Sequence, residues 1–414
     1  MSVEHINQIA HFPKLAGQVS GHRGRNLQRL VDAAKVVVHG VQRHGIGVVG
    51  WHYPRINALA DERWISDEGR ELISKARALV PSLAEREQAA LATREMPVET
   101  MEDYKRAGVL RVLQPKRFGG YQELSILLSR IVEELAHGCA SSAWVYAVLA
   151  EHAWIIASFP EQAQIDVWGE DPLAVASSSL APRATALRVT GGYRLSGLYP
   201  FSSGCGHAQW AIVGAFCEDA SGRRHQRYML VPMSEIDVID DWHTLGLRGT
   251  GSRTLNLRDV FIPEHRSVRF SDLVEGTPPG LRMHPDYPML RAPRPLLAIY
   301  SQPPVTVTLG RRALDLVASL LSGRVSRGLT KMAESEVVQM KIAESAAEID
   351  MATLVLHTRR RRSMDVLMSG APIPKEEFLE TRRDLVFAQR NVRLAVERLC
   401  EISSTELVYD TSPL

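Results

Sequence analysis

Hydroxyl, thiol and imidazole groups lie close together between Phe201 and Trp210, in the stretch FSSGCGHAQW. Serine hydroxyls can both donate and accept hydrogen bonds, and an imidazole can take up a proton near neutral pH. The segments on either side alternate like β-strands, so this stretch interrupts a sheet. On its own, it fits either a turn that faces a ligand or a β-bulge with Cys205 buried as a packing residue.

The composition predicts a globular protein and excludes several classes of partner. The chain has 414 residues, which favours two or three domains, and its net charge of +2 gives no reason to expect a nucleic-acid partner. No apolar run approaches the ~20 residues that cross a membrane, and the N-terminus lacks a signal-peptide pattern. The four cysteines form no CxxC pair, so we expect a cytoplasmic enzyme or binding protein without a thiolate metal site.

The first 65 residues keep neither a helical nor a strand period, and we expect an irregular N-terminal extension. Residues 45–50 spell GxGxxG, a pattern that marks a dinucleotide site only where a strand ends and a helix begins. Pro54 disfavours a helix opening at that point. His39, His44 and His52 have no acidic or thiolate neighbours, so we expect solvated side chains and no metal site.

Residues 66–164 are predicted to form an N-terminal helical domain. Apolar residues recur at helical spacing in its first segment, and Pro81 should kink or end that helix. A second helix, 99–107, should stop at the glycine that follows it. A longer helical segment, 124–159, should break near Gly138.

Residues 165–272 are predicted to form a middle β domain, because the hydrophobic period changes to two. Gly191-Gly192 suits a tight hairpin turn. Segments 209–217 and 226–232 read as a strand pair, and 253–263 as one more strand. Short strands with glycine turns and no intervening helices indicate an antiparallel, barrel-like domain.

Residues 285–414 are predicted to form a C-terminal helix bundle. A short helix, 311–321, should precede two long ones, 335–368 and 375–402; the first of these would be about 50 Å long. The apolar stripe of the last helix consists of Leu379, Val386, Val392, Val396 and Leu399. The chain is thus expected to be an α+β multidomain protein with helices, then strands, then a helix bundle.

The basic run Arg359–Arg362 lies inside the long helix 335–368. Because the net charge is close to neutral, we interpret it as a solvated face or a subunit contact rather than a nucleic-acid site.

Three stretches resemble the acyl-CoA dehydrogenase superfamily over roughly residues 70–414: LQPKRFGG (113–120), WHTLGLRGTGS (242–252) and VFIP (260–263). Three further motifs resemble one branch of it, the oxygenase components of two-component flavin-dependent aromatic monooxygenases. They are ASSAW (140–144), ASSSLAP (176–182) and FSSGCGH (201–207). This branch includes p-hydroxyphenylacetate 3-hydroxylase and the steroid-ring phenol hydroxylase.

The resemblance implies an enzyme that takes reduced FMN or FAD from a separate flavin reductase and binds O₂. Such enzymes hydroxylate a small phenolic substrate through a C4a-hydroperoxyflavin, and they are usually homotetramers. That adduct survives only where water is excluded, and an apolar helix wall that includes Val145, Val148, Leu149 and Trp154 would exclude it.

The resemblance also implies site residues. As catalytic candidates, Ser203 would hydrogen-bond near flavin N5, Ser178 would lie beside flavin and substrate, and His152 would face the phenol as a base near neutral pH. Cofactor-binding candidates are Trp144, Ser177, Ser178, Ser179, Ser202, Ser203 and Arg294, the last of which matches an arginine near the isoalloxazine ring.

Each of these residues also has a purely structural interpretation. The serine run of 177–179 suits a helix cap or a turn. Trp144 and His152 fit a buried helix as core residues, and His207 could cap a strand edge.

The end of the sequence departs from this branch. Members normally continue with a helical segment whose histidine contacts flavin and phenol, whereas this sequence ends at Val408–Leu414. We therefore expect a truncated bundle and an activity that is in doubt. Two alternatives to the monooxygenase follow. One is an acyl-CoA dehydrogenase-type flavoenzyme with a carboxylate base such as Glu336, Glu344 or Glu348, and the other is a non-catalytic, flavin-binding remnant.

Overall fold

The computed structural model describes residues 62–219, 221–325 and 331–403. Residues 62–320 and 340–403 belong to one compact unit. Residues 321–339 belong to another, in which Val325 and Lys331 form an isolated bridge. The predictions for GxGxxG at 45–50, for the histidines at 39, 44 and 52, and for the end at 408–414 lie outside the described residues.

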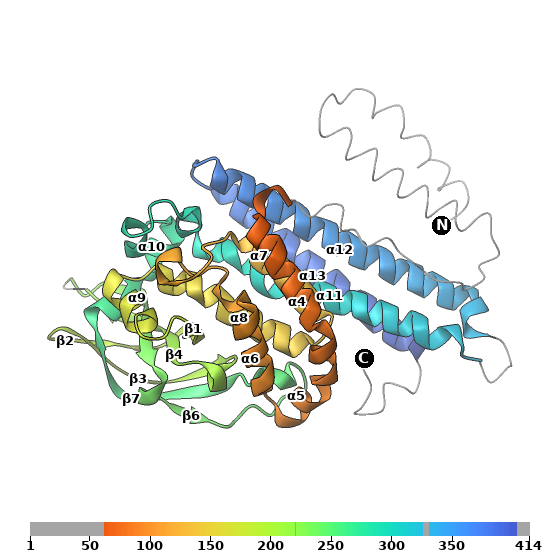
Figure 1. Ribbon diagram of the computed structural model, residues 1–414, viewed down its shortest axis with the longest axis horizontal. Coiled ribbons are helices and arrows are strands. Elements are labelled where there is room, and N and C mark those ends of the chain that lie inside the picture. The colour runs from red at the N-terminus through yellow and green to blue at the C-terminus, as the bar shows by residue number, and fades with distance from the viewer. Residues whose placement is uncertain (1–61, 220, 326–330, 404–414) are drawn as a thin grey trace. The chain divides into compact units, whose positions relative to one another are not determined.

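Six helices of the described chain precede the strands (Figure 1). They are α4 (Asp67–Glu85), α5 (Glu87–Thr93), α6 (Val98–Ala107), α7 (Ser125–Ala136), α8 (Ala140–Ala157) and α9 (Glu161–Trp168). Ser66 caps α4, since its Oγ accepts a hydrogen bond from Gly69 N. Helix α6 ends at Gly108, whose φ is 79°, as predicted. The break at Gly138 is confirmed, and a Cβ there would lie 2.6 Å from Val80 O.

Helix α4 does not end at Pro81 but continues to Glu85, so of the two predicted outcomes, a kink or an end, the end was wrong. A proline inside a helix costs about 3 kcal/mol through its missing N–H and its ring clash. Ala76 and Leu83, on either side of Pro81, are both buried in the core. Burial of this apolar face outweighs the local cost.

The strands form two four-stranded sheets, with the orders β1-β4-β5-β8 and β2-β3-β7-β6. Their bounds are β1 (Ala176–Thr185), β2 (Leu187–Val189), β3 (Gly192–Ser202), β4 (Trp210–Glu218), β5 (Arg224–Pro232), β6 (Asp237–Ile239), β7 (Arg253–Pro263) and β8 (Ser267–Arg269). A core between them includes Tyr199, Val213 and Leu255. The hairpin between β2 and β3 is confirmed, with Val189 paired to Gly192.

The prediction that all strands are antiparallel was wrong for one pair. β1 runs parallel to β4, with Ser178 opposite Ile212. Between these two strands the chain passes through β2 and β3 of the other sheet, and it returns to the first sheet in its original direction. This excursion brings the turn after β3 back to the start of β4.

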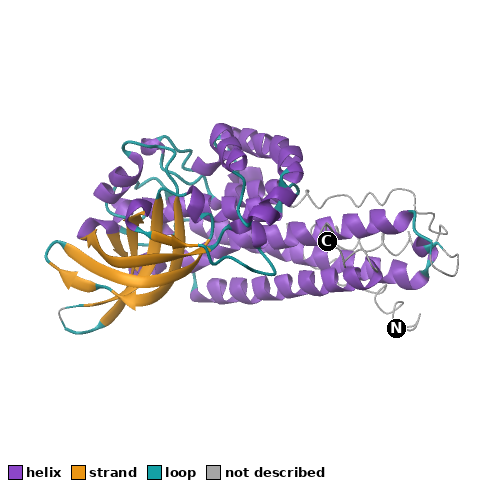
Figure 2. Ribbon diagram, turned by 90° about the horizontal axis from the view of Figure 1, so that it is seen from below, coloured by secondary structure: helices purple, strands orange, loops and turns teal. Residues whose placement is uncertain are grey.

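The C-terminal helices are α11 (Arg294–Ser322), α12 (Glu336–Met368) and α13 (Lys375–Ser403), and a short α10 (Phe270–Glu275) precedes them. Helices α11, α12 and α13 run side by side (Figure 1 and Figure 2), and Arg398 of α13 pairs with Glu348 of α12 at 2.8 Å. The prediction of a short helix over 311–321 was wrong, because α11 begins at Arg294 and passes through Pro303 and Pro304. The buried side chains of α11, such as Leu297, Tyr300 and Val305, hold it through the prolines.

Two predictions for the bundle surface were wrong in part. In the apolar stripe of α13, Val392 and Leu399 are buried, but Leu379 and Val386 are exposed. In the basic run, Arg359 and Arg360 lie within the fold rather than on a solvated face, whereas Arg362 is exposed. Arg360 is buried and its Nη1 lies 2.6 Å from Glu133, while Arg359 pairs with Glu380 of α13 at 2.9 Å.

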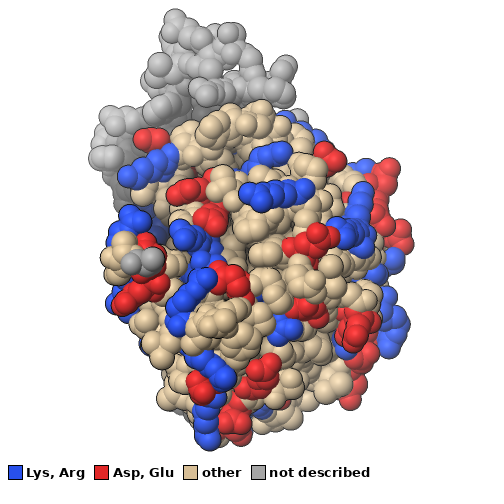
Figure 3. All heavy atoms as spheres, turned by 90° about the vertical axis from the view of Figure 1, so that its left-hand side faces the viewer, with Lys and Arg blue, Asp and Glu red and all other residues tan. Residues whose placement is uncertain are grey.

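One hydrophobic core joins the helices before the sheets, one sheet face and the bundle. It includes Leu149 of α8, Ile212 of β4 and Leu297 of α11. The face in Figure 3 shows Lys and Arg interspersed with Asp and Glu, without a stripe of one sign. Among the described helices, none is long and apolar enough to cross a membrane, and no three metal-binding side chains gather in the described residues.

Candidate active site

A cleft of about 290 Å³ opens where α8, β1, the end of β3 and α11 meet. That volume is close to the lower limit of sites for small molecules, roughly 300 Å³. Its lining residues are Trp144, Val148, His152, Ser178, Ser179, Leu180, Ala181, Arg183, Pro200, Phe201, Ser203 and Gln302. The structure thus brings together five of the predicted site residues: Trp144, His152, Ser178, Ser179 and Ser203.

His152 is held as a neutral hydrogen-bond acceptor. Its Nδ1 lies 2.6 Å from the Ala176 carbonyl, which can only accept, so Nδ1 carries the proton. Its Nε2 then accepts a hydrogen bond from Ser178 Oγ at 2.9 Å. Burial lowers the pKa of His152 to about 4, although the charge of neighbouring Glu151 opposes the shift. The proton of Ser178 therefore points to the imidazole, and its oxygen can accept from a ligand in the cleft.

The three serines of β1 divide between two sides, because successive side chains of a strand alternate. Ser177 and Ser179 face β3: Ser202 Oγ donates to Ser177 Oγ at 3.0 Å, and Ser179 Oγ donates to Pro200 O at 2.7 Å. Ser178 faces α8. The run is part of a strand and neither a cap nor a turn. Ser177 and Ser202 are fully buried, and neither lines the cleft.

The turn after β3 places Ser203 at the cleft. Phe201 has a φ of 65°, which is strained for a side chain of this size. Gly204 follows with a φ of 68°, and its N–H donates to Thr250 O at 2.9 Å. A Cβ at Gly204 would lie 2.7 Å from Val145 Cγ1, so only glycine lets the turn approach α8 this closely.

Ser203 is the first of three linked hydroxyls. Its Oγ lies 2.7 Å from Ser252 Oγ, which lies 2.6 Å from Thr250 Oγ1. Thr250 Oγ1 in turn donates to Leu247 O at 2.9 Å. Ser252 and Thr250 are buried, and neither lines the cleft.

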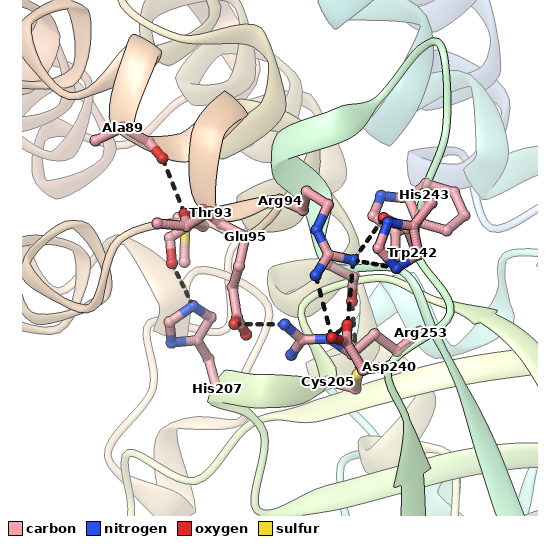
Figure 4. A network of polar contacts seen from close by, with 12 residues as sticks. Ala89, Thr93, Arg94, Glu95, Cys205, His207, Asp240, Trp242, His243 and Arg253 are labelled. Carbon is pink, nitrogen blue, oxygen red and sulfur yellow. Dashed lines mark hydrogen bonds and ion pairs between the residues drawn. The ribbon is translucent and has the colours of Figure 1, made fainter.

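A network of polar contacts holds this region against the first helices (Figure 4). Arg253 Nη2 lies 3.0 Å from Glu95 Oε2, and its Nε lies 3.2 Å from Asp240 Oδ1. Arg94 also pairs with Asp240, at 3.1 Å. His207 Nε2 donates to Met96 O at 2.7 Å, so His207 anchors the turn to the segment before α6 rather than facing the cleft.

Arg294 lies outside the residues that line the cleft. Its Nη2 forms an ion pair with Glu151 Oε1 at 2.9 Å, and both side chains are largely buried. Glu151 directly precedes His152 on α8, so the ion pair lies next to this histidine in the sequence. A direct contact of Arg294 with a flavin ring stays a prediction.

Several lining residues escaped the sequence interpretation. Arg183 is exposed at the cleft and follows the ASSSLAP motif directly, while Gln302 precedes Pro303 in α11. Neither residue type has a periodic signal. Thr250 and Ser252 stand in the RGTGS part of a motif used for the resemblance, yet only the fold shows their link to Ser203.

Both sequence and structure comparisons identify relatives. The N-terminal domain of acyl-CoA dehydrogenase matches residues 66–171, and the C-terminal domain matches residues 302–414. The oxygenase subunit HsaA of a flavin-dependent monooxygenase from Rhodococcus jostii is 33% identical over 81% of this chain and 88% of that protein. This chain belongs to the family of flavin-dependent monooxygenase oxygenase components.

One further relative and one solved structure support the assignment. The oxygenase component of an FADH(2)-dependent resorcinol hydroxylase from a Rhizobium species is 38% identical over 64% of this chain and 66% of that protein. The crystal structure of 3-HSA hydroxylase from Rhodococcus sp. RHA1 has a TM-score of 0.78, with 33% identity over 83% of this chain and 88% of that one. The predicted acyl-CoA dehydrogenase-like α+β fold is confirmed.

The doubt about activity that followed from the expected truncation has no support among these monooxygenase relatives. The C-terminal domain match includes residues 302–414, and the HsaA alignment covers 88% of that protein.

Proposed function

We propose that this chain hydroxylates a phenolic substrate with O₂ and a reduced flavin that a separate reductase delivers. The observation that carries the proposal is the single cleft lined by Trp144, Ser178 and Ser203, with His152 bonded to Ser178. The name of the Rhizobium relative describes an FADH(2)-dependent resorcinol hydroxylase, and resorcinol is a phenol. The names of two relatives, an oxygenase subunit and an oxygenase component, imply that each works with a separate reductase, and we propose the same kind of partner for this chain.

The donor set of the cleft fits a flavin beside a phenol. An isoalloxazine ring needs a flat apolar surface and a few hydrogen bonds. Trp144 and Val148 supply the apolar surface, and Ser178 and Ser203 supply hydrogen bonds. When bound, reduced flavin supplies the activation of O₂, while the protein orients and shields it. Val148 and Trp144 come from α8, so this helix excludes water from one side of the cleft.

His152 acts on the phenol as a hydrogen-bond acceptor through Ser178 in this proposal. A phenol has a pKa near 10, and that of His152 is about 4. Full proton transfer to the imidazole would therefore cost roughly 8 kcal/mol, at 1.36 kcal/mol for each pKa unit. The relay from phenol to Ser178 to His152 instead pulls the phenolic proton away in part. The ring carbon beside the hydroxyl becomes more electron-rich, as electrophilic oxygen transfer requires.

The acyl-CoA dehydrogenase alternative needs a carboxylate base at the flavin. Among the described residues that line the cleft there is no Asp or Glu. Glu344 and Glu348 both pair with Arg398 of α13, and Glu336 is exposed at the start of α12. The cleft therefore offers no carboxylate base among its described lining residues, which favours hydroxylation over acyl-CoA dehydrogenation.

Single-turnover mixing tests the proposal. The protein is mixed anaerobically with reduced FMN or FADH₂ and a phenol, and then with O₂; catechol-type product and H₂O₂ are quantified. We expect product with at least one of a panel of simple phenols, resorcinol included. Peroxide alone from the whole panel would indicate the non-catalytic remnant. Oxidation of butyryl-CoA with tightly retained flavin would favour the dehydrogenase.

A further inference from the structure

The hydroxyl chain that begins at Ser203 has a fixed direction. Each hydroxyl has one proton to donate, and the chain ends at Leu247 O, a carbonyl that can only accept. Thr250 must therefore donate to Leu247 O, since without that proton two oxygens would face each other through lone pairs at 2.9 Å. Trp242 Nε1 also donates to this carbonyl, at 3.0 Å, and holds it in place.

The remaining directions follow one after the other. Because Thr250 already donates its proton to Leu247 O, Ser252 must be the donor in the 2.6 Å contact between Ser252 Oγ and Thr250 Oγ1. The 2.7 Å contact between Ser252 and Ser203 then needs the proton of Ser203. Ser203 Oγ is left with lone pairs, and no proton, toward the cleft.

We propose that Ser252 and Thr250 fix Ser203 as a hydrogen-bond acceptor and thereby make the cleft selective for reduced over oxidised flavin. This rests on the proposed function, in which a flavin occupies the cleft, and on the implication of the resemblance that flavin N5 lies near Ser203. N5 of a reduced flavin carries a proton and can donate to Ser203. N5 of an oxidised flavin has only a lone pair, which would face another lone pair.

The selectivity suits a protein that receives its flavin reduced and must release it oxidised. The gain or loss of one neutral hydrogen bond predicts a preference of roughly 3- to 10-fold. Ser252 and Thr250 are positioning residues, because they act through Ser203. Their own placement depends on Arg253, the residue after Ser252, which binds Glu95 and Asp240 (Figure 4).

Equilibrium binding of FMN in both redox states tests this proposal. Dissociation constants for oxidised and anaerobically reduced FMN are measured on the wild type, Ser252→Ala and Thr250→Val. Ser252→Ala frees the Ser203 proton to rotate toward the cleft. Thr250→Val leaves Ser252 free to donate to Ser203, which reverses the chain. In both variants the ratio of the oxidised to the reduced Kd should fall by roughly 3- to 10-fold.

Two controls separate this effect from a loss of folding. Ser252→Thr keeps the hydroxyl and should keep the wild-type ratio. Thr381→Val removes a buried hydroxyl of α13, outside the cleft, and should also leave the ratio unchanged. An unchanged ratio in both Ser252→Ala and Thr250→Val, with reduced FMN still bound, would overturn the selectivity alone. Failure of the wild type to bind either form would overturn the proposed function as well.

Discussion

Ser178 Oγ lies 2.9 Å from His152 Nε2, and this hydroxyl joins a buried neutral imidazole to the open cleft. The opposite nitrogen of the ring is held by the carbonyl of Ala176, two residues before Ser178. Strand β1 therefore supplies both the Ala176 carbonyl, which fixes the tautomer of His152, and the Ser178 hydroxyl, which donates to the free Nε2. In the proposed function, a phenol in the cleft would meet Ser178 Oγ as an acceptor, because the Ser178 proton is already donated to His152.

Removal of the Ser178 hydroxyl should slow hydroxylation more than it weakens flavin binding. We expect Ser178→Ala to lower the rate of product formation roughly 3- to 10-fold, because the phenol loses one acceptor. The Kd of reduced flavin should change less than twofold. Single-turnover product yield and a binding titration measure the two effects. An unchanged product rate would remove the Ser178–His152 pair from the proposed reaction.

Ser203→Ala should uncouple the reaction. Without the acceptor at the cleft, we expect the ratio of H₂O₂ to hydroxylated product to rise roughly 3- to 10-fold at saturating reduced flavin. Ser196→Ala is a control on β3, the strand that precedes the Ser203 turn, since Ser196 Oγ accepts from Asp259 N at an exposed site. Equal ratios in the two variants would exclude Ser203 from the proposed role.

Acidification should destabilise the protein between pH 6.5 and pH 4. The pKa of His152 falls to about 4 on folding, mainly through burial. The unfolded chain therefore binds more protons in this window, and stability is complete above pH 6.5 and is lost as the pH falls. At pH 5 the loss due to His152 should be ~2 kcal/mol relative to pH 7.5. His357, whose pKa is also lowered to about 4 by burial, adds to it in the same direction.

Urea unfolding at pH 7.5 and pH 5 measures this loss. His152→Gln, which cannot titrate, should reduce the difference between the two pH values. His243→Gln, at an exposed position, should leave the difference unchanged. A difference that is the same in His152→Gln as in the wild type would contradict the assignment.

Gly204→Ala should cost more stability than Gly222→Ala. Both glycines have positive φ, 68° and 77°, and a side chain there costs about 1–2 kcal/mol. A Cβ at Gly204 would also lie 2.7 Å from Val145 Cγ1, whereas nothing lies within 4 Å at Gly222. Thermal unfolding compares the two variants. When Val145→Ala is added to Gly204→Ala, only the part of the stability loss that comes from the clash should be recovered. Equal stability losses at the two glycines would show that the clash is absent.

The sequence was informative where a signal is local. Strand β7 begins and ends as predicted, at Arg253 and Pro263, because hydrophobic alternation marks a half-buried strand. The convergence of Trp144, Ser178 and Ser203 on one cleft agrees with the resemblance, although their roles stay predictions.

Features that depend on distant partners were missed. Arg360 looked like part of a solvated basic run, but its partner Glu133 lies 227 positions away in the sequence and makes burial favourable. Burial lifts the pKa of that carboxylate, yet the charges of His357, Arg360 and Arg130 bring it down to about 2. Helix α11 continues through Pro303 and Pro304 for a similar reason, since tertiary packing outweighs the local preference.

Arg253 joins two regions that are distant in sequence, through Glu95 before α6 and Asp240 after β6. Ser252 is its neighbour in the chain, so these two contacts hold the backbone next to Ser252. In the proposed function, the orientation of Ser203 would therefore depend on the docking of the first helices against the sheets, because Glu95 and Asp240 lie on the two sides of that contact.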